Sequence, residues 1–194
     1  MPKIEIEGIP AQQIASYPKE FASVISGREK QRIGDAAGLT QFGVNITRIK
    51  AGSASALRHW HEHEDEFIYM LEGELILREN EGETVLSPGD AAGFKAGSGI
   101  AHCLVNRSER DAVYLEVGTR ARSERVHYPD VDFMMERLEA GDFYILCPDN
   151  QVPRSLDERR ILWAAGDIVE NRPPLSRWHP DYAKAFEVFS QKID

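Results

Sequence analysis

The chain has 194 residues, of which 42% are hydrophobic and 28% charged, a composition typical of a one-domain globular protein. Its formal net charge of −9 argues against a nucleic acid or an anionic membrane surface as partner, because such partners select basic patches. The start of the chain lacks the apolar core of a secretory signal, and no segment approaches the roughly 18 apolar residues of a membrane span. Cys103 and Cys147 are too few for a disulfide framework, so we expect a cytoplasmic, reduced protein.

In chain order, residues 1–40 form an N-terminal arm, with a short helix predicted over 12–25 and weakened by Pro18. Residues 41–120 are dense in strand signals, at 42–49, 57–61, 67–71, 75–77, 84–86, 102–105 and 113–117. Glu72-Gly73 is typical of a tight hairpin, and residues 87–90 of a turn. Short strands separated by turns predict an all-β sandwich or barrel.

Residues 121–194 form a C-terminal extension that we expect to be partly helical, with helices over 132–138, 157–165 and 180–192. Large aromatic side chains are costly to leave in water, and this segment carries Trp163, Trp178, Phe186 and Phe189. The extension should therefore pack on the barrel or on a partner subunit. We favour the partner subunit and expect a homodimer; the alternative is that the extension folds back on its own barrel.

A run of histidines and acidic residues spans 59–66. Alternation along a strand places His59 and His61 on one face, and Glu66 can return to that face from the next strand. Two imidazoles and a carboxylate can bind a divalent transition metal. The best candidate for a further ligand is His102, which follows a glycine-rich turn and opens a later strand.

Two questions about this run stay open. A His61/His63 pair could replace His59/His61, although only two residues would then separate it from Glu66; otherwise His63 lies in the acidic turn. The remaining acids are expected to be exposed turn residues, with the alternative that one of them orients a ligand imidazole: Glu62, Glu64 and Asp65.

These residues and their spacing resemble the two motifs of the cupin superfamily. The first motif is matched by Gly52, His59, His61, Glu66 and Gly73, and the second by Gly89, Lys95, Gly97, His102 and Asn106. Lys95 stands where the family usually has proline, and the gaps before His59 and His102 are longer than usual. The resemblance covers about residues 41–120. It implies a double-stranded β-helix, or jelly roll, with a metal bound by His59, His61, Glu66 and His102.

The strand pattern also predicts which side chains line the interior. If Glu66 faces inward, Ile68 and Met70 do too, while Phe67, Tyr69 and Leu71 face outward. The expected substrate-binding wall is Leu57, Ile68, Met70, Leu104 and Asn106. This mainly apolar wall suits a modest organic ligand better than a heavily hydroxylated sugar, unless these residues simply fill the barrel. Polar additions could come from Tyr114 and Glu116, and an anion could be attracted by Lys95 and Arg58, which are otherwise plain surface charges.

We therefore expect a metal-dependent enzyme acting on a small organic molecule at a centre of three histidines and one glutamate, with dioxygenase-type oxidation favoured. The ligands are compatible with Fe, Mn, Ni, Co, Cu or Zn and do not choose among them. The alternatives are an isomerase, lyase or decarboxylase, and a non-catalytic sensor or carrier of a metal or small ligand. No catalytic residue beyond the metal ligands is assigned. Cys103 follows His102 directly, so the two side chains point to opposite sides of a strand and make a poor nucleophile–base pair.

Overall fold

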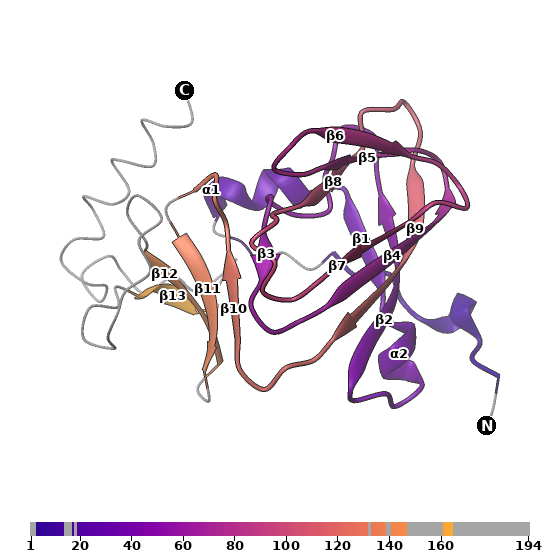
Figure 1. Ribbon diagram of the computed structural model, residues 1–194. Coiled ribbons are helices and arrows are strands. Elements are labelled where there is room, and N and C mark those ends of the chain that lie inside the picture. The colour runs from indigo at the N-terminus through magenta and orange to yellow at the C-terminus, as the bar shows by residue number, and fades with distance from the viewer. Residues whose placement is uncertain are drawn as a thin grey trace.

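The computed structural model (Figure 1) describes residues 3–13, 17, 19–131, 133–138, 141–146 and 161–164. The helix expected over 180–192 and the side chains of Cys147, Trp178, Phe186 and Phe189 lie outside the described residues. In the described ranges, no helix is both long enough and apolar enough to cross a lipid bilayer.

The helical segments are η1 (Ile6–Gly8), α1 (Lys19–Ala22), η2 (Ser23–Ile25) and α2 (Ile33–Ala36). The strands are β1 (Arg28–Gln31), β2 (Phe42–Ile49), β3 (Trp60–His61), β4 (Glu66–Glu72), β5 (Leu75–Arg78), β6 (Glu83–Leu86), β7 (Ala91–Phe94), β8 (Cys103–Val105), β9 (Ala112–Thr119), β10 (Glu124–His127), β11 (Phe133–Leu138), β12 (Gly141–Leu146) and β13 (Ile161–Ala164).

Two antiparallel sheets form the walls of a jelly roll. One has the strand order β1-β2-β9-β4-β7 and the other β6-β5-β8, and Figure 1 shows them on either side of the barrel. Isolated bridges from Ala54 to Val105 and from His59 to His102 extend the second wall onto the segment that leads into β3. The expected all-β jelly roll is thus confirmed, although only Trp60–His61 of the extended segment expected at 57–61 is a strand.

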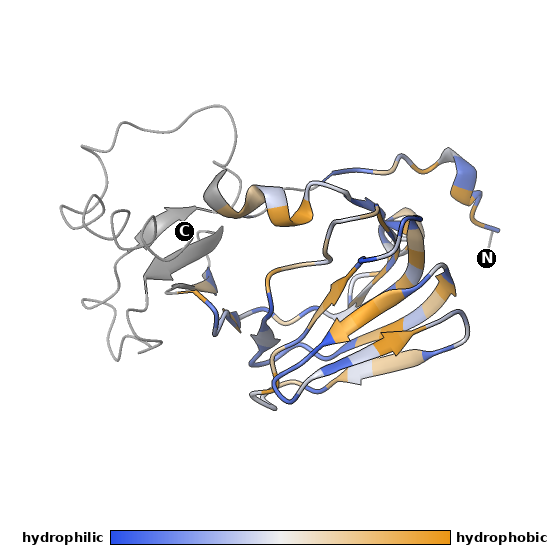
Figure 2. Ribbon diagram, turned by 90° about the horizontal axis from the view of Figure 1, so that it is seen from above, coloured by the Kyte–Doolittle hydropathy of each residue, from blue (hydrophilic) through white to orange (hydrophobic). Residues whose placement is uncertain are grey.

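Strand β4 has the predicted alternation, which Figure 2 shows as bands of apolar and polar residues along the barrel strands. Its outward residues Phe67, Tyr69 and Leu71 are 44%, 40% and 40% exposed. Ile68 and Met70 are 4% and 0% exposed and pack between the walls with side chains of both sheets: Ile49, Leu75, Leu77, Leu86, Leu104, Ala112 and Tyr114. Burial of each such side chain stabilises the fold by about 1.5–3 kcal/mol. The same parity brings Glu66 to the interior at the start of the strand.

The turn at Glu72-Gly73 is not the hairpin that the sequence predicts. Strand β4 pairs with β7 and β9, whereas β5 pairs with β6 and β8, so the turn carries the chain from one sheet to the other. Gly73 makes this crossing with φ of +73°, and a Cβ at this position would lie 2.6 Å from the carbonyl oxygen of Asp111. The site therefore needs glycine both for its backbone conformation and for its close approach to the loop before β9.

We expect Gly73→Ala to lower the free energy of unfolding by about 2–5 kcal/mol, because it adds a clash to the strain of a left-handed residue. Gly38 is a matched control, since its φ is +72° and a Cβ there meets nothing within 4 Å. Gly38→Ala should cost only about 1–2 kcal/mol. Urea unfolding of both variants measures the difference. Equal losses at the two sites would show that the approach to Asp111 carries no weight.

The extension beyond the barrel is a sheet in the described residues. Its strand order is β13-β12-β11-β10-β3, so it continues from the strand that carries His61. The helices expected over 132–138 and 157–165 are therefore wrong for 133–138 and 161–164, which are strands. Residues such as Met134 and Glu136 favour helices when isolated. Here both are buried, two residues apart, on one side of a strand that pairs with β10 and β12.

The N-terminal arm packs against this extension. Of the helix expected over 12–25, the described residues show a helical segment at Lys19–Ile25, whereas Gln12 bridges to Lys30 as extended chain. Strand β1, also in the segment assigned to the arm, pairs with β2 as part of the barrel sheet. A second buried cluster joins the arm to β10 and the residues beside it: Tyr17, Phe21, Ile25, Ala56, Val126 and Tyr128. Tyr128 also stacks on the ring of His59, at 5.8 Å between centroids.

Candidate metal centre

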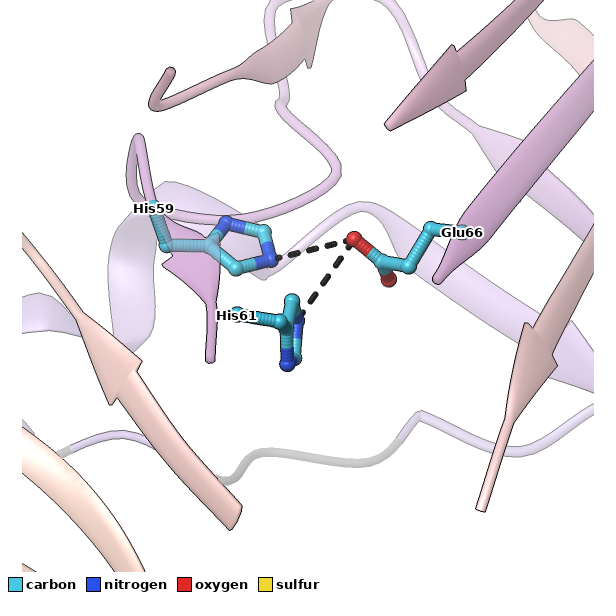
Figure 3. A group of neighbouring side chains, drawn as sticks. All are labelled: His59, His61 and Glu66. Atoms are coloured by element: carbon cyan, nitrogen blue, oxygen red, sulfur yellow. Dashed lines mark ion pairs between the residues drawn. The ribbon is translucent and has the colours of Figure 1, made fainter. Parts of the chain in front are cut away.

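The side chains of His59, His61 and Glu66 point toward one another inside the barrel (Figure 3). The two Nε2 atoms lie 3.8 and 3.5 Å from Glu66 Oε2, and each of the three residues offers a ligand atom within 4.8 Å of the others. His102 joins this group through Glu66, because its Nε2 is 3.0 Å from the same oxygen. The four residues predicted as ligands thus lie together, with the three histidines around a single carboxylate oxygen of Glu66.

Strand pairing explains the convergence. His59 and His102 form an antiparallel bridge, with N···O distances of 3.0 and 2.8 Å between their backbones, which places their side chains on one face. His61 follows His59 by two residues and therefore faces the same way. Glu66 comes from the opposite wall at the start of β4. The ring of His102 is held from behind by Phe94, stacked at 3.5 Å between centroids.

The protonation states of the group favour metal binding. His59 Nδ1 donates to the carbonyl oxygen of Leu57 at 2.8 Å, so its Nε2 keeps a lone pair directed at Glu66. Burial lowers the pKa of His59 to about 3. Burial alone would raise the pKa of Glu66, but the hydrogen bond with His102 and the rings of His61 and His59 outweigh it and hold that pKa below its ordinary value. At neutral pH, His59 is neutral and Glu66 ionised, which are the forms that bind cations.

The lowered pKa of His59 makes the stability of the metal-free protein sensitive to acid. The pKa of His59 is about 3 in the folded chain against an ordinary value of 6.5, so the unfolded chain binds more protons between these values. The contribution of His59 to the free energy of unfolding is fully present above pH 6.5 and is lost as the pH falls toward 3. We expect up to about 3 kcal/mol to be lost between pH 7 and 4 through this group. Urea unfolding at several pH values should show a shallower pH dependence for His59→Gln than for the wild type, whereas equal slopes would contradict this origin.

The donor set fits a divalent transition metal. Imidazole nitrogens combined with a carboxylate suit Fe, Mn, Ni, Co, Cu or Zn, and the group is enclosed, with side-chain exposures of 7–13% for the three histidines. His59, His61 and Glu66 form the compact part of the site, and His102 would complete it. Such a bound ion would act as a Lewis acid toward a carbonyl or hydroxyl oxygen.

A cavity of about 100 Å³ adjoins the group and reaches three of its members, His59, Glu66 and His102. At roughly 10–15 Å³ for each water position, it holds about seven to ten non-hydrogen atoms. Its wall includes apolar side chains, but also charged and phenolic groups that are buried or half-buried: Tyr17, Arg28, Lys30, Tyr114 and Glu116. The cavity is therefore more polar than the sequence predicts.

The polar side of the cavity is an ordered network around Glu116. Its carboxylate accepts hydrogen bonds from Lys30 at 2.6 Å and from Asn45 at 3.0 Å, and Thr47 and Tyr114 contact its second oxygen. Burial by itself raises the pKa of Glu116, but the Lys30 ammonium outweighs it and keeps that pKa below the ordinary value. Arg28 lies two residues from Lys30 on the same face of β1, where Nη1 donates to the carbonyl oxygen of Ser55 at 2.6 Å. The cavity thus presents an ionised carboxylate and two cationic groups.

Only two of the five residues expected to form the substrate-binding wall line the cavity. Ile68 and Leu104 line the cavity. Met70 is fully buried in the core, Leu57 packs with the cluster around Tyr17, and Asn106 holds the loop after β8 by donating to the carbonyl oxygens of Ile49 and Arg110.

The charged residues suggested for anion attraction also lie away from the cavity wall. Lys95 is exposed, and Arg58 forms a two-pronged ion pair with Asp130. The cationic groups on the wall are instead Arg28 and Lys30. The sequence indicates that Arg28 and Lys30 face the same side, because residues two apart in an extended segment do so. It does not indicate how their segment pairs with β2.

The acidic turn is less exposed than expected. His63 is exposed, so the structure favours the His59/His61 pair over His61/His63. Asp65 is exposed as predicted, but Glu62 and Glu64 are half-buried. Glu62 contacts His127 Nε2 at 2.7 Å, and Glu64 accepts from Arg137 at 2.8 Å. Cys103 is buried, and burial raises its pKa to about 11, so it is no thiolate nucleophile at neutral pH.

The protein is thus a jelly-roll β-barrel in which inward-facing histidines and a glutamate, from opposite walls, form a candidate metal centre. Residues 45–118 match the cupin domain family. A crystal structure of a sugar phosphate isomerase of the cupin superfamily from Silicibacter pomeroyi is 38% identical, covering 80% of this chain and 98% of that one with a TM-score of 0.74. The chain therefore belongs to the cupin superfamily.

Two further structures resemble the chain. A candidate sugar phosphate isomerase from Acidithiobacillus ferrooxidans is 29% identical over 66% of this chain and 81% of that one, with a TM-score of 0.61. The polyketide cyclase RemF from Streptomyces resistomycificus is 18% identical over 61% and 79%, with a TM-score of 0.52, and shares the fold alone. No curated protein matches the chain.

Proposed function

We propose that the protein is a metal-dependent enzyme that isomerises a small anionic hydroxycarbonyl compound, such as a sugar phosphate. The observation that carries this proposal is the composition of the cavity, which joins the candidate metal ligands to Arg28, Lys30 and Glu116. An arginine in a buried wall can bind a phosphate or carboxylate by two parallel hydrogen bonds. The names of the Silicibacter and Acidithiobacillus proteins support the same substrate class.

The reaction needs a group that moves a proton between neighbouring carbons, and Glu116 is suited to it. Its carboxylate is ionised and faces the cavity, so it can take a proton from the carbon beside a carbonyl. The electron pair of that C–H bond then forms an enediolate. The hydroxyl proton passes to the former carbonyl oxygen, and Glu116 returns its proton to the neighbouring carbon, which completes the isomerisation without any further reactant. Lys30, 2.6 Å from Glu116, keeps the carboxylate oriented. A bound metal would polarise the carbonyl oxygen.

The size of the cavity limits the substrate. Room for about seven to ten non-hydrogen atoms matches a three-carbon sugar phosphate, and a longer chain would extend beyond this space. The charged and hydrogen-bonding wall is poorly suited to a purely apolar ligand, because such a ligand would leave buried polar groups unpaired.

The test is solvent exchange followed by proton NMR in D₂O. The protein, loaded separately with Mn, Fe(II), Co, Ni and Zn, is incubated with three- to six-carbon aldose and ketose phosphates and with the same sugars unphosphorylated. We expect conversion and deuterium uptake at the carbon beside the carbonyl with at least one phosphorylated compound, and neither with Glu116→Gln. Absence of conversion, exchange and binding for every compound and metal would reject the proposal.

Oxidation is the second candidate, favoured by the apolar part of the same cavity at Ile68, Phe94 and Leu104. Oxygen uptake by the Fe(II)-loaded protein across a panel of small acids and phenols distinguishes it from isomerisation. A protein that binds a metal and a ligand tightly, without turnover in either assay, would instead be a sensor or carrier.

A further inference from the structure

His61 differs from His59 in what lies behind its ring. His61 Nε2 faces Glu66, while His61 Nδ1 is buried and has no hydrogen-bond partner among the described residues. Two carboxylate oxygens flank this nitrogen, Glu64 Oε2 and Glu124 Oε1, each at 3.9 Å. In His59 the corresponding nitrogen donates to the carbonyl oxygen of Leu57 at 2.8 Å. The position that a carbonyl fills for His59 is thus taken by two acids for His61.

Glu124 is fixed to the strand that carries His61. Its side chain is 0% exposed, and its carboxylate accepts from the backbone nitrogens of Glu62 at 2.9 Å, His63 at 3.2 Å and Arg125 at 2.8 Å. The pairing of β10 with β3, in which Val126 lies opposite His61, sets this register. A fully buried carboxylate held by three backbone donors is rigid, so its position beside His61 is fixed.

Glu64 is held separately from the other side. Its Oε1 accepts from Arg137 Nη1 at 2.8 Å and from the backbone nitrogen of Ala121 at 2.9 Å, which leaves Oε2 toward the imidazole. Glu124, Ala121 and Arg137 all lie after residue 118, beyond the segment that matches the cupin domain family. The sheet that follows the barrel therefore reaches back to a candidate ligand.

We propose that Glu124, assisted by Glu64, is a positioning residue that holds His61 with its proton on Nδ1 and its Nε2 lone pair toward the metal. An imidazole that binds a cation through Nε2 must keep its proton on Nδ1, and a carboxylate behind it fixes both the tautomer and the ring orientation. This inference rests on the metal binding of the proposed function, but not on the identity of the substrate or the reaction.

The same three side chains could be taken for a second cation site, since their ligand atoms lie within 4.8 Å of one another. Two features argue against it. A cation on Nδ1 as well as on Nε2 would require His61 to lose its last ring proton. In addition, Arg137 already neutralises Glu64, and backbone donors already occupy the Glu124 carboxylate.

The test compares Glu124→Gln with Glu62→Gln, a control that removes a nearby acid that contacts His127 and Arg125 rather than His61. Nitrogen-15 NMR of the metal-free protein reports the tautomer, with the His61 signals assigned by their loss in His61→Asn. We expect the Nδ1–H form in the wild type and in Glu62→Gln, and a substantial Nε2–H form in Glu124→Gln. We also expect Glu124→Gln to weaken Co(II) binding about 10–100-fold and to shift its visible bands, and Glu62→Gln to leave both unchanged.

An unchanged tautomer and an unchanged Co(II) affinity in Glu124→Gln would overturn the proposal. So would two cations per wild-type chain of which Glu124→Gln loses one, since this would reveal a second cation site. If Glu124→Gln does not fold, as judged by its thermal unfolding, Glu64→Gln is measured at the same nitrogen with the same two readouts and the same expected directions. Because neither readout involves turnover, failure of the isomerase assay would leave this result intact.

Discussion

Glu66→Gln should lose tight metal binding while the chain stays folded. Glu66 Oε2 is the atom on which all three histidines converge, at 3.0, 3.5 and 3.8 Å, and the replacement removes the negative charge of the group without changing its size. Loss of an outer-shell partner costs a metal site about 10–100-fold, so loss of this ligand should weaken binding by more than about 100-fold. Competition with a chelator, together with metal analysis of the purified protein, measures the effect.

The matched control for this prediction is Glu72→Gln, at the other end of the same strand. Glu72 is exposed, so the substitution makes the same charge change on β4 without reaching the interior. It should keep the metal content and affinity of the wild type. Metal binding by Glu66→Gln that matches Glu72→Gln would mean that the ion, if bound, lies elsewhere.

Arg28→Gln should selectively impair the use of anionic substrates. Arg28 is 8% exposed and lies on the cavity wall, where hydrogen bonds to a charged group contribute about 1.5–3 kcal/mol. We therefore expect KM for a phosphorylated substrate to rise about 10–150-fold. Arg28→Lys should recover only part of the loss, because a lysine retains the charge but not the two-pronged geometry. Initial-rate kinetics on paired phosphorylated and unphosphorylated compounds measure the selectivity.

The control for Arg28 is Arg107→Gln, which removes a surface arginine paired with Glu83 and should leave KM unchanged. Thermal unfolding of Arg28→Gln separates a loss of substrate binding from a loss of stability, since Arg28 also donates to the carbonyl oxygen of Ser55. An equal loss for phosphorylated and unphosphorylated compounds in a stable variant would contradict a role in anion binding.

Three of the four candidate metal ligands could be predicted because their positions follow from short-range rules. The side chains of His59 and His61 share a face through simple alternation, and Glu66 follows within one turn of the chain. His102 needed pairing between segments distant in sequence, which the spaced glycines and the resemblance to cupins supplied. The inward and outward residues of β4 followed from the same alternation.

The polar wall of the cavity could not be predicted in this way. Arg28 and Lys30 reach the interior because β1 pairs with β2 in one register, with Lys30 opposite Thr47. A shift of one residue would turn both side chains outward, and the sequence alone does not set that register. Glu116 was noted as a possible polar contribution, but its partner Lys30 lies 86 residues away in the chain.

The described strands of the extension, at 133–138 and 161–164, were mispredicted as helices for a related reason. The segment 133–138 contains residues of good helix propensity, but propensity is a weak preference that strand pairing on both sides overrides. Recognising β10 as the partner of β3 would also have revealed Glu124 behind His61. The position of Glu124 depends on the pairing of β10 with β3, and β10 lies outside the segment 41–120 that carries the two motifs.

The most direct test of the central claim is a crystal structure of the metal-loaded protein with anomalous scattering measured at the absorption edge of the ion. We predict one strong anomalous peak per chain, bound by His59 Nε2, His61 Nε2, Glu66 and His102, with metal–ligand distances of about 2.0–2.2 Å. A peak between Glu64 and Glu124, or no peak at the converging side chains under conditions in which the ion is in excess, would contradict the account.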